Sequence, residues 1–318
     1  MRPMRKQAPL DPDTWLSKRL SEVHRSSCAP ASTAAAGAAA GRIFVSIAAY
    51  CDPELPATLR SMLLHAERWL DLPEILPSFT DASPVARLHG VAQVGALATG
   101  EGSDPPLPPG GELPLPGRRA APRWRARLGG RLREVRLRAE DARGPCWARY
   151  LAQLLWRGEE LYLQLDSHMR FVPQWDRHMR EQLAACLRRS AKPVLCGYGR
   201  GYELGTPYDW TPPADDMPCL NCAGFFDDNS VLNIRYRTLK AQWPAPQPAL
   251  FWSAHFSFSS SELLAQVPYD PQLPMLFYGE EILMTVRMFT HGWDLFAPSR
   301  GLVYHLWQRE YRRVYIST

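Results

Sequence analysis

The sequence predicts an α/β protein, in which buried strands alternate with helices. Residues 42–50 form a continuous apolar run rich in β-branched side chains, which is typical of a strand buried on both faces of a parallel sheet. A helix is expected directly after it, over residues 55–70, because Asp52 and nearby prolines mark its start. A strand followed at once by a capped helix indicates one half of a nucleotide-binding α/β fold.

The same alternation continues along the chain. The periodicity predicts further strands at residues 88–94, 132–137, 161–165, 193–197, 250–259 and 302–304. It predicts further helices at residues 145–156, 175–187 and 280–292. The sequence contains neither GxGxxG nor GxxxxGK[ST], so neither a dinucleotide-binding loop nor a P-loop is indicated.

The composition is that of an ordinary globular protein, except for one stretch rich in arginine. The chain has 318 residues, of which 46% are hydrophobic and 22% charged, so a sizeable core is expected. Its formal charge of +5 reflects a local excess of arginine between Arg118 and Arg138. That stretch is expected to form a solvated face and strand edge, with binding of an acceptor or an anionic surface as the open alternative. It contains one aromatic residue, Trp124, which argues against nucleic-acid binding.

Two segments are predicted to lie outside the core. Residues 1–41 are interpreted as a loosely docked N-terminal extension, and residues 97–130 as a low-complexity insertion rich in glycine and proline. Residues 1–41 and 97–125 are expected to be poorly ordered, because neither segment can bury enough apolar surface to offset its ordering entropy. The domain proper is predicted to span residues 42–318.

Cysteine usage and hydropathy predict a cytoplasmic location. The seven cysteines are odd in number and irregularly spaced, which favours a reducing compartment. Cys219 and Cys222 form the one CxxC motif and are expected to be two reduced, metal-free thiols. No apolar run approaches the roughly 20 residues of a membrane span, and residues 1–28 lack a secretory apolar core.

A short polar motif follows the strand at residues 161–165. Asp166 and His168 stand where that strand breaks into charge, and ligands bind at such strand ends in α/β folds. A carboxylate and an imidazole two residues apart can both face one cation, so the pair is a candidate metal site. Taken alone, the motif is more often a turn followed by a surface histidine.

Several stretches in the same order resemble a known family. They are residues 43–55, 142–153, 156–160, 164–171, 277–281 and 304–307. From residue 43 to residue 307 the chain resembles the polypeptide (hydroxyproline) N-acetylglucosaminyltransferases. It is more distantly similar to the polypeptide N-acetylgalactosaminyltransferases. The resemblance implies a GT-A (Rossmann-like) glycosyltransferase fold with a mixed central sheet.

The resemblance also implies a site. It makes Asp166, His168 and His305 the ligands of Mn²⁺ or Mg²⁺, with UDP-GlcNAc as the donor. His305 could otherwise be a core or surface histidine packed against Trp307. Arg149 is expected to orient the Asp166 loop or to contact the diphosphate.

The remaining implied site residues lie at two places in the sequence. Ala49, Tyr50 and Asp52, at the end of the first strand, are expected to bind the nucleotide sugar, as is Asp166 itself. The catalytic candidates are Glu280 and Glu281, which would hold acceptor or sugar hydroxyls. The sequence departs from the family at Cys51, where the family usually has arginine, and at residues 97–130.

The implied function is a retaining transfer of GlcNAc from a UDP-sugar to a hydroxyl acceptor. Hydroxyproline, serine or threonine of a polypeptide is the expected acceptor, and neither glutamate is expected to form a covalent bond with the sugar. Two alternatives stay open: a UDP-sugar hydrolase that uses the same metal site, and a catalytically silent binding module.

Overall fold

The structure is a computed structural model that describes residues 41–67, 91–99, 132–213, 217–228 and 230–311. Most of the predicted N-terminal extension and residues 100–130 of the predicted insertion lie outside the described residues. Strand β2 (Val91–Thr99) continues through residues 97–99, past the point where the insertion was predicted to begin.

The main sheet is mixed. Strand β1 (Ile43–Tyr50) pairs in parallel with β4 (Leu161–Asp166) and antiparallel with β2, so the expectation of a parallel sheet around β1 is wrong on one side. On the other side of β4, strand β11 (Phe256–Ser260) runs antiparallel between β4 and β6 (Pro193–Cys196). The strand order is β10-β12-β6-β11-β4-β1-β2-β3. Its remaining strands are β3 (Leu132–Arg138), β10 (Gln247–Pro248) and β12 (Asp294–Ala297).

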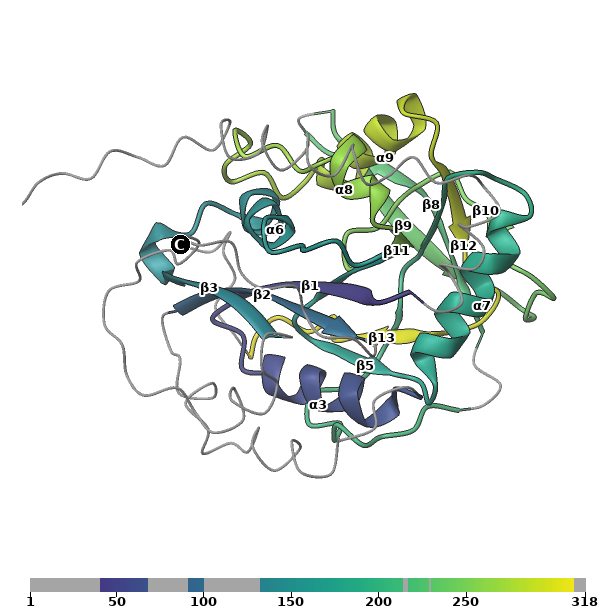
Figure 1. The fold of residues 1–318 in the computed structure, drawn as a ribbon, viewed down its shortest axis with the longest axis horizontal. Coiled ribbons are helices and arrows are strands. Elements are labelled where there is room, and N and C mark those ends of the chain that lie inside the picture. The colour runs from purple at the N-terminus through teal and green to yellow at the C-terminus, as the bar shows by residue number, and fades with distance from the viewer. Residues whose placement is uncertain (1–40, 68–90, 100–131, 214–216, 229, 312–318) are drawn as a thin grey trace, which may run out of the picture.

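Helices cover both faces of this sheet (Figure 1). The side chains of Ile43, Val45 and Ile47 pack in one cluster with residues of α3 (Leu55–His65) and α7 (Trp175–Leu187). Phe44 points to the opposite face and packs with residues of three other helices. These are α6 (Pro145–Gln153), α8 (Glu262–Gln266) and α9 (Glu280–Thr290). This alternation explains why β1 is apolar at consecutive positions, because each face of the strand is buried.

Two smaller sheets lie beside the main one. Strands β5 (Met169–Phe171), β13 (Val303–His305) and β7 (Arg200–Gly201) form one, in the order β5-β13-β7. Strands β8 (Cys219–Phe226) and β9 (Leu232–Thr238) form a separate antiparallel ribbon. Cys219 pairs with Thr238 and Cys222 with Arg235, so the two thiols lie on opposite faces of β8, and both are free.

Most predicted elements are present, with shifted ends. Helix α7 spans residues 175–187 as predicted, whereas α3 ends at His65 instead of residue 70. The strand predicted at residues 250–259 begins only at Phe256. None of the helices in the described segments is long and apolar enough to cross a lipid bilayer.

Candidate metal centre

Three side chains from two distant parts of the sequence converge at the end of β4. Candidate ligand atoms of Asp166, His168 and His305 all lie within 4.8 Å of one another. Oδ2 of Asp166 is 3.3 Å from Nε2 of His305 and 3.8 Å from Nε2 of His168. One carboxylate oxygen and two imidazole nitrogens that face one point form a donor set suited to a divalent cation.

The small three-stranded sheet brings His305 to this point. Asp166 ends β4, and the chain turns through Ser167 and His168 into β5. Strand β13 pairs antiparallel with β5 so that His305 lies opposite Met169, and the backbone N–H of Leu306 donates to the carbonyl of His168 at 3.1 Å. The register of two short strands thus places His305 beside the Asp-Ser-His turn.

Asp52 fixes the Asp-Ser-His turn through hydrogen bonds. Its side chain is fully enclosed, and Oδ2 accepts hydrogen bonds from the hydroxyl of Ser167 at 2.6 Å and from Nδ1 of His168 at 2.7 Å. Oδ1 accepts the backbone N–H of Glu54 at 3.0 Å and the hydroxyl of Tyr311 at 3.2 Å. Because an ionised carboxylate only accepts hydrogen bonds, Nδ1 of His168 carries the proton and Nε2 presents its lone pair toward Asp166.

Arg149 and Glu280 form a buried ion pair behind Asp166. Arg149 donates to Oδ1 of Asp166 at 2.7 Å and to both carboxylate oxygens of Glu280 at 2.5 and 2.6 Å. The hydroxyl of Tyr269 also donates to Glu280, at 2.6 Å. Burial would raise the pKa of Asp166, but the hydrogen bond from His305 and the charge of Arg149 bring that pKa well below its ordinary value. Asp166 is therefore ionised, as a cation ligand must be.

The neighbouring glutamate has a different environment. The carboxylate of Glu281 accepts the hydroxyl of Tyr198 at 2.7 Å and the backbone N–H of Ala254 at 3.0 Å. Burial raises the pKa of Glu281 to about 7, although both hydrogen bonds oppose that rise. Glu280 is thus enclosed in an ion pair, whereas Glu281 has a protonation state that changes near neutral pH.

An aromatic group borders the histidines. The ring of His305 lies 4.1 Å from that of Trp307 and 4.8 Å from that of His255, measured between centroids. Nε2 of His255 accepts the backbone N–H of Gly199 at 3.1 Å, and burial with the nearby charge of His305 lowers the pKa of His255 well below its usual value. His305 therefore has both features considered for it, contact with Trp307 and a ring nitrogen directed at Asp166.

Comparison with known proteins gives the chain its family. Residues 115–318, more than half of the sequence, match the family described as "Glycosyltransferase (GlcNAc)". The chain belongs to this glycosyltransferase family. The predicted membership is thereby confirmed, and the strand order confirms the predicted α/β class with a mixed central sheet.

Two other comparisons gave weaker results. A crystal structure of GalNAc-T7 with UDP, GalNAc and Mn²⁺ aligns with 53% of this chain at 15% sequence identity and a TM-score of 0.39. This chain covers 31% of that protein's length. No curated protein sequence matches the chain.

In this glycosyltransferase the end of β1 runs alongside Asp166. Ala48 is the parallel partner of Asp166, so Ala49 and Tyr50 continue just beyond the site. Ala49 is buried in the core, which leaves its backbone as the part that can meet a ligand. Cys51 follows with a φ of 48°, in the left-handed region that non-glycine residues rarely adopt.

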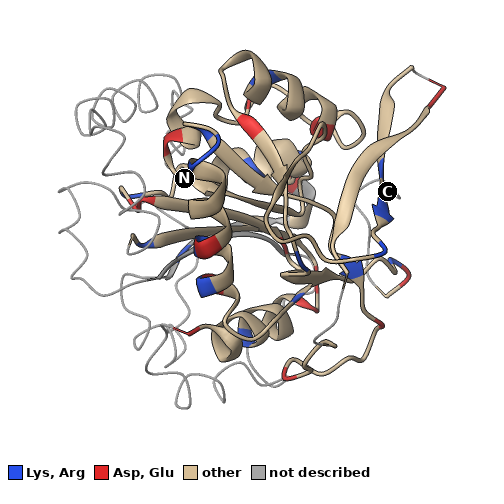
Figure 2. Cartoon of the chain, turned by 90° about the vertical axis from the view of Figure 1, so that its right-hand side faces the viewer, with Lys and Arg blue, Asp and Glu red and all other residues tan. Residues whose placement is uncertain are grey.

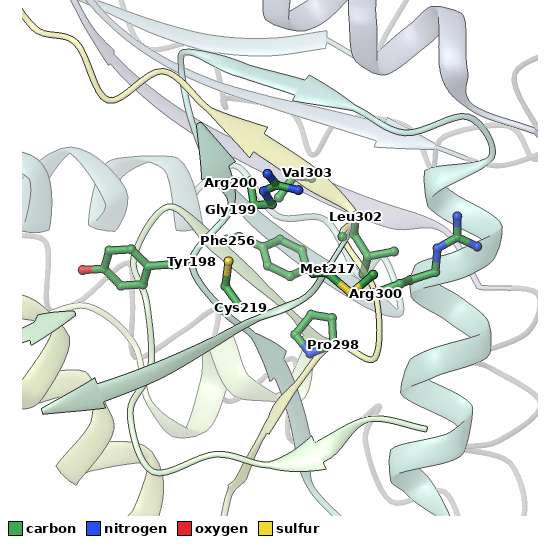
Figure 3. A pocket seen from close by; sticks show the side chains of 12 residues that line it. Tyr198, Gly199, Arg200, Met217, Cys219, Phe256, Pro298, Arg300, Leu302 and Val303 are labelled. Carbon is green, nitrogen blue, oxygen red and sulfur yellow. The ribbon is translucent and has the colours of Figure 1, made fainter. Parts of the chain in front are cut away.

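A pocket of the glycosyltransferase lies next to this centre but does not contain it. Its lining includes Tyr198, Arg200, Cys219, Phe256 and Val303 (Figure 3), and none of the three candidate ligands. It has space for about one water molecule, which is far too little for a nucleotide. The pocket is therefore not the donor site.

Two residues beside the metal centre, Tyr198 and His255, were not predicted from the sequence, and Asp52 was predicted to have a different role. Asp52 was predicted to bind the nucleotide sugar, and its contact with His168 was not foreseen. Tyr198 follows β6, so the rule that strand ends carry ligands could have identified it. His255 lies within the segment predicted as a strand over residues 250–259, and nothing local in the sequence marks its contact with His305.

Proposed function

We propose that this glycosyltransferase moves GlcNAc from UDP-GlcNAc to a hydroxyl acceptor, with retention of configuration and with a divalent cation held by Asp166, His168 and His305. The observation that carries the proposal is the convergence of one carboxylate oxygen and two imidazole nitrogens at the end of β4, within a member of a glycosyltransferase family. A donor carrying a diphosphate suits such a site, because a cation held there would offset the negative charge of the phosphates.

The donor set favours Mn²⁺. Magnesium prefers an octahedron of oxygen ligands, whereas two nitrogens and one oxygen suit a transition metal of borderline softness. The ionised Asp166 and the fixed tautomer of His168 both fit a cation. Mg²⁺ is the second candidate.

When bound, the cation would offset negative charge on the departing UDP. The protein's own residues prepare the site for that event. Asp52 positions His168 through Nδ1, and Arg149 holds Asp166 through Oδ1. We assign the nucleotide end of the donor to the end of β1. There Ala49 and Tyr50 follow Ala48, which pairs with Asp166.

The two glutamates take different parts in this proposal. Glu280 positions Arg149, because the ion pair and Tyr269 already occupy its carboxylate. Glu281 accepts a hydrogen bond from an acceptor or sugar hydroxyl, in exchange for the hydroxyl of Tyr198. Neither side chain needs to bond to the sugar, since the departing phosphate oxygen can take the proton of the attacking hydroxyl.

A polypeptide hydroxyl of hydroxyproline, serine or threonine is the proposed acceptor. The proposed location is the cytoplasm, which rests on the spacing of the cysteines. A hydrolase acting on UDP-sugars would use the same metal site without any acceptor, and the experiment below separates the two reactions.

The test follows UDP release from UDP-GlcNAc, UDP-GalNAc and UDP-glucose, with Mn²⁺ or with a chelator. Release should require Mn²⁺, should be fastest with UDP-GlcNAc and should rise when hydroxyproline, serine or threonine peptides are added. Release that ignores all peptides would favour the hydrolase. Release at the same rate with chelator would contradict the metal site.

A further inference from the structure

The base of the β8–β9 ribbon packs against Tyr198 and Trp307, beside the metal centre. Its inner face is fixed to the body by Asn221, whose amide oxygen accepts the backbone N–H of Tyr198 at 3.0 Å and whose amide nitrogen donates to the carbonyl of Phe251 at 2.9 Å. Asn221 and Ile234 on that face are buried. Beyond Ala223 the strand register shifts, and the tip of the ribbon turns through Asp227 and Asp228.

Stacked aromatic rings connect the ribbon to the site. Tyr236 of β9 stacks on Tyr198, with centroids 5.5 Å apart, and on Trp307 at 5.8 Å. Trp307 in turn contacts the candidate ligand His305. An acceptor polypeptide bound at the metal centre would therefore contact the ribbon as the neighbouring surface.

The outer face of the ribbon combines aromatic and cationic side chains. Phe225 is 50% exposed, and the guanidinium carbon of Arg235 lies 5.0 Å from the centroid of its ring. Arg237 is two residues further along the same face and is also exposed. Within the described part of the chain, neither arginine makes an ion pair. Such a face presents two cations and an apolar surface to solvent.

We propose that this ribbon is a docking surface for an extended, acidic segment of the polypeptide acceptor, which rests on the proposed function. Residues two apart on a strand lie roughly 6.6 Å apart, so Arg235 and Arg237 match carboxylates at alternate positions of an extended chain. Figure 2 shows the ribbon as a two-stranded arm beside the body, with its acidic residues at the tip and its basic residues nearer the body. An acidic chain is therefore favoured along the part of the ribbon nearest the metal centre.

Fluorescence anisotropy tests this with a labelled peptide of about twelve residues in which glutamate and serine alternate. The full-length protein is used with chelator and without UDP, so that the result does not depend on the metal centre. The Arg235→Gln/Arg237→Gln variant should bind this peptide about fivefold to thirtyfold more weakly than wild type. A peptide with glutamine in place of glutamate should bind wild type as weakly as the acidic peptide binds the variant.

A second double variant is the control for the loss of two positive charges elsewhere on the surface. Arg177→Gln/Arg188→Gln removes the same charge from exposed positions on and just after α7 and should keep wild-type affinity within about twofold. Equal binding by wild type and the ribbon variant would overturn the proposal. Tighter binding of single-stranded oligothymidine than of the acidic peptide would also overturn it, in favour of a nucleic-acid partner.

UDP release separates this inference from the proposed function. The ribbon variant should release UDP from UDP-GlcNAc at the wild-type rate with free serine or free hydroxyproline as acceptor, because the ribbon does not hold the donor. If peptide binding depends on the ribbon but UDP-GlcNAc is not turned over, the docking surface is supported and the proposed transfer reaction is contradicted. If UDP-GlcNAc is turned over but the variant binds the peptide as wild type does, only the docking surface is contradicted.

Discussion

Nδ1 of His168 lies 2.7 Å from Oδ2 of Asp52, a carboxylate that is 116 residues away in sequence and fully enclosed in the fold. This contact assigns the imidazole proton to Nδ1 and directs Nε2 at Asp166. The same Oδ2 accepts the hydroxyl of Ser167, so a single buried oxygen fixes both residues that follow Asp166. The geometry of the proposed metal centre thus depends on a residue that would not touch the cation.

Replacing Asp52 by asparagine should weaken Mn²⁺ binding about tenfold to a hundredfold, because an amide no longer favours one tautomer of His168 so strongly. Titration calorimetry with Mn²⁺ measures the loss. In the metal-free variant, ¹⁵N NMR should show a mixture of His168 tautomers where wild type shows one. Asp270→Asn, at an exposed position, is the matched control. Unchanged Mn²⁺ affinity together with a single tautomer would contradict the positioning role.

The second prediction concerns His305. His305→Ala should abolish the dependence of UDP binding on Mn²⁺, although the residue lies 139 positions beyond Asp166. Calorimetry should show wild type binding UDP much more tightly with Mn²⁺ than with chelator, and the variant binding equally weakly in both. His291→Ala removes an exposed histidine and should behave as wild type, while circular dichroism checks that both variants fold. If His305→Ala keeps the full effect of Mn²⁺, His305 is not a ligand.

The sequence predicted most strands and helices but not the order of the strands. Helix α7 was predicted within its observed bounds because its apolar positions recur at helical spacing. The position of β11 between β4 and β6 could not be predicted, since backbone hydrogen bonds between strands leave no local pattern in either one. The mixed sheet was therefore expected only from the family resemblance.

The candidate site was likewise predicted only in part from the sequence. Asp166 and His168 were identified from residues alone, because a strand ends there in two polar side chains. His305 was identified through the resemblance, and the reason for its placement is the pairing of His305 with Met169 in the small sheet. Asp52 was assigned to nucleotide-sugar binding through the same resemblance. Its contact with His168 could not be predicted, because it joins segments that no spacing rule connects.

Glu280 is expected to stabilise the fold through its ion pair with Arg149. Glu280→Gln should lower the free energy of unfolding by about 3–5 kcal/mol, because it leaves the buried guanidinium of Arg149 with one anionic partner instead of two. Urea denaturation followed by circular dichroism measures the change. Glu262→Gln, in the exposed first turn of α8, should change stability by less than about 0.5 kcal/mol. A loss of similar size in both variants would show that Glu280 contributes no more than a surface carboxylate.

The last prediction uses the raised pKa of Glu281. Its pKa rises from 4.5 to about 7 on folding, chiefly through burial, so between these values the folded protein binds a proton that the unfolded chain does not. Stability must then fall as pH rises through this interval, by on the order of 3 kcal/mol for this group. Glu281→Gln keeps the uncharged state at every pH and removes this fall. Its stability advantage over wild type should therefore grow between about pH 5 and about pH 8.

Urea denaturation of both proteins at several pH values measures this difference. Other groups titrate equally in the two proteins, so their contributions cancel when one curve is subtracted from the other. Glu262→Gln supplies the control, because an exposed glutamate should give a difference that does not vary with pH over the same range. Parallel curves for wild type and Glu281→Gln would mean that Glu281 is already ionised in the folded protein at pH values well below 7. In that case the hydrogen bonds from Tyr198 and Ala254 outweigh the cost of burying its charge.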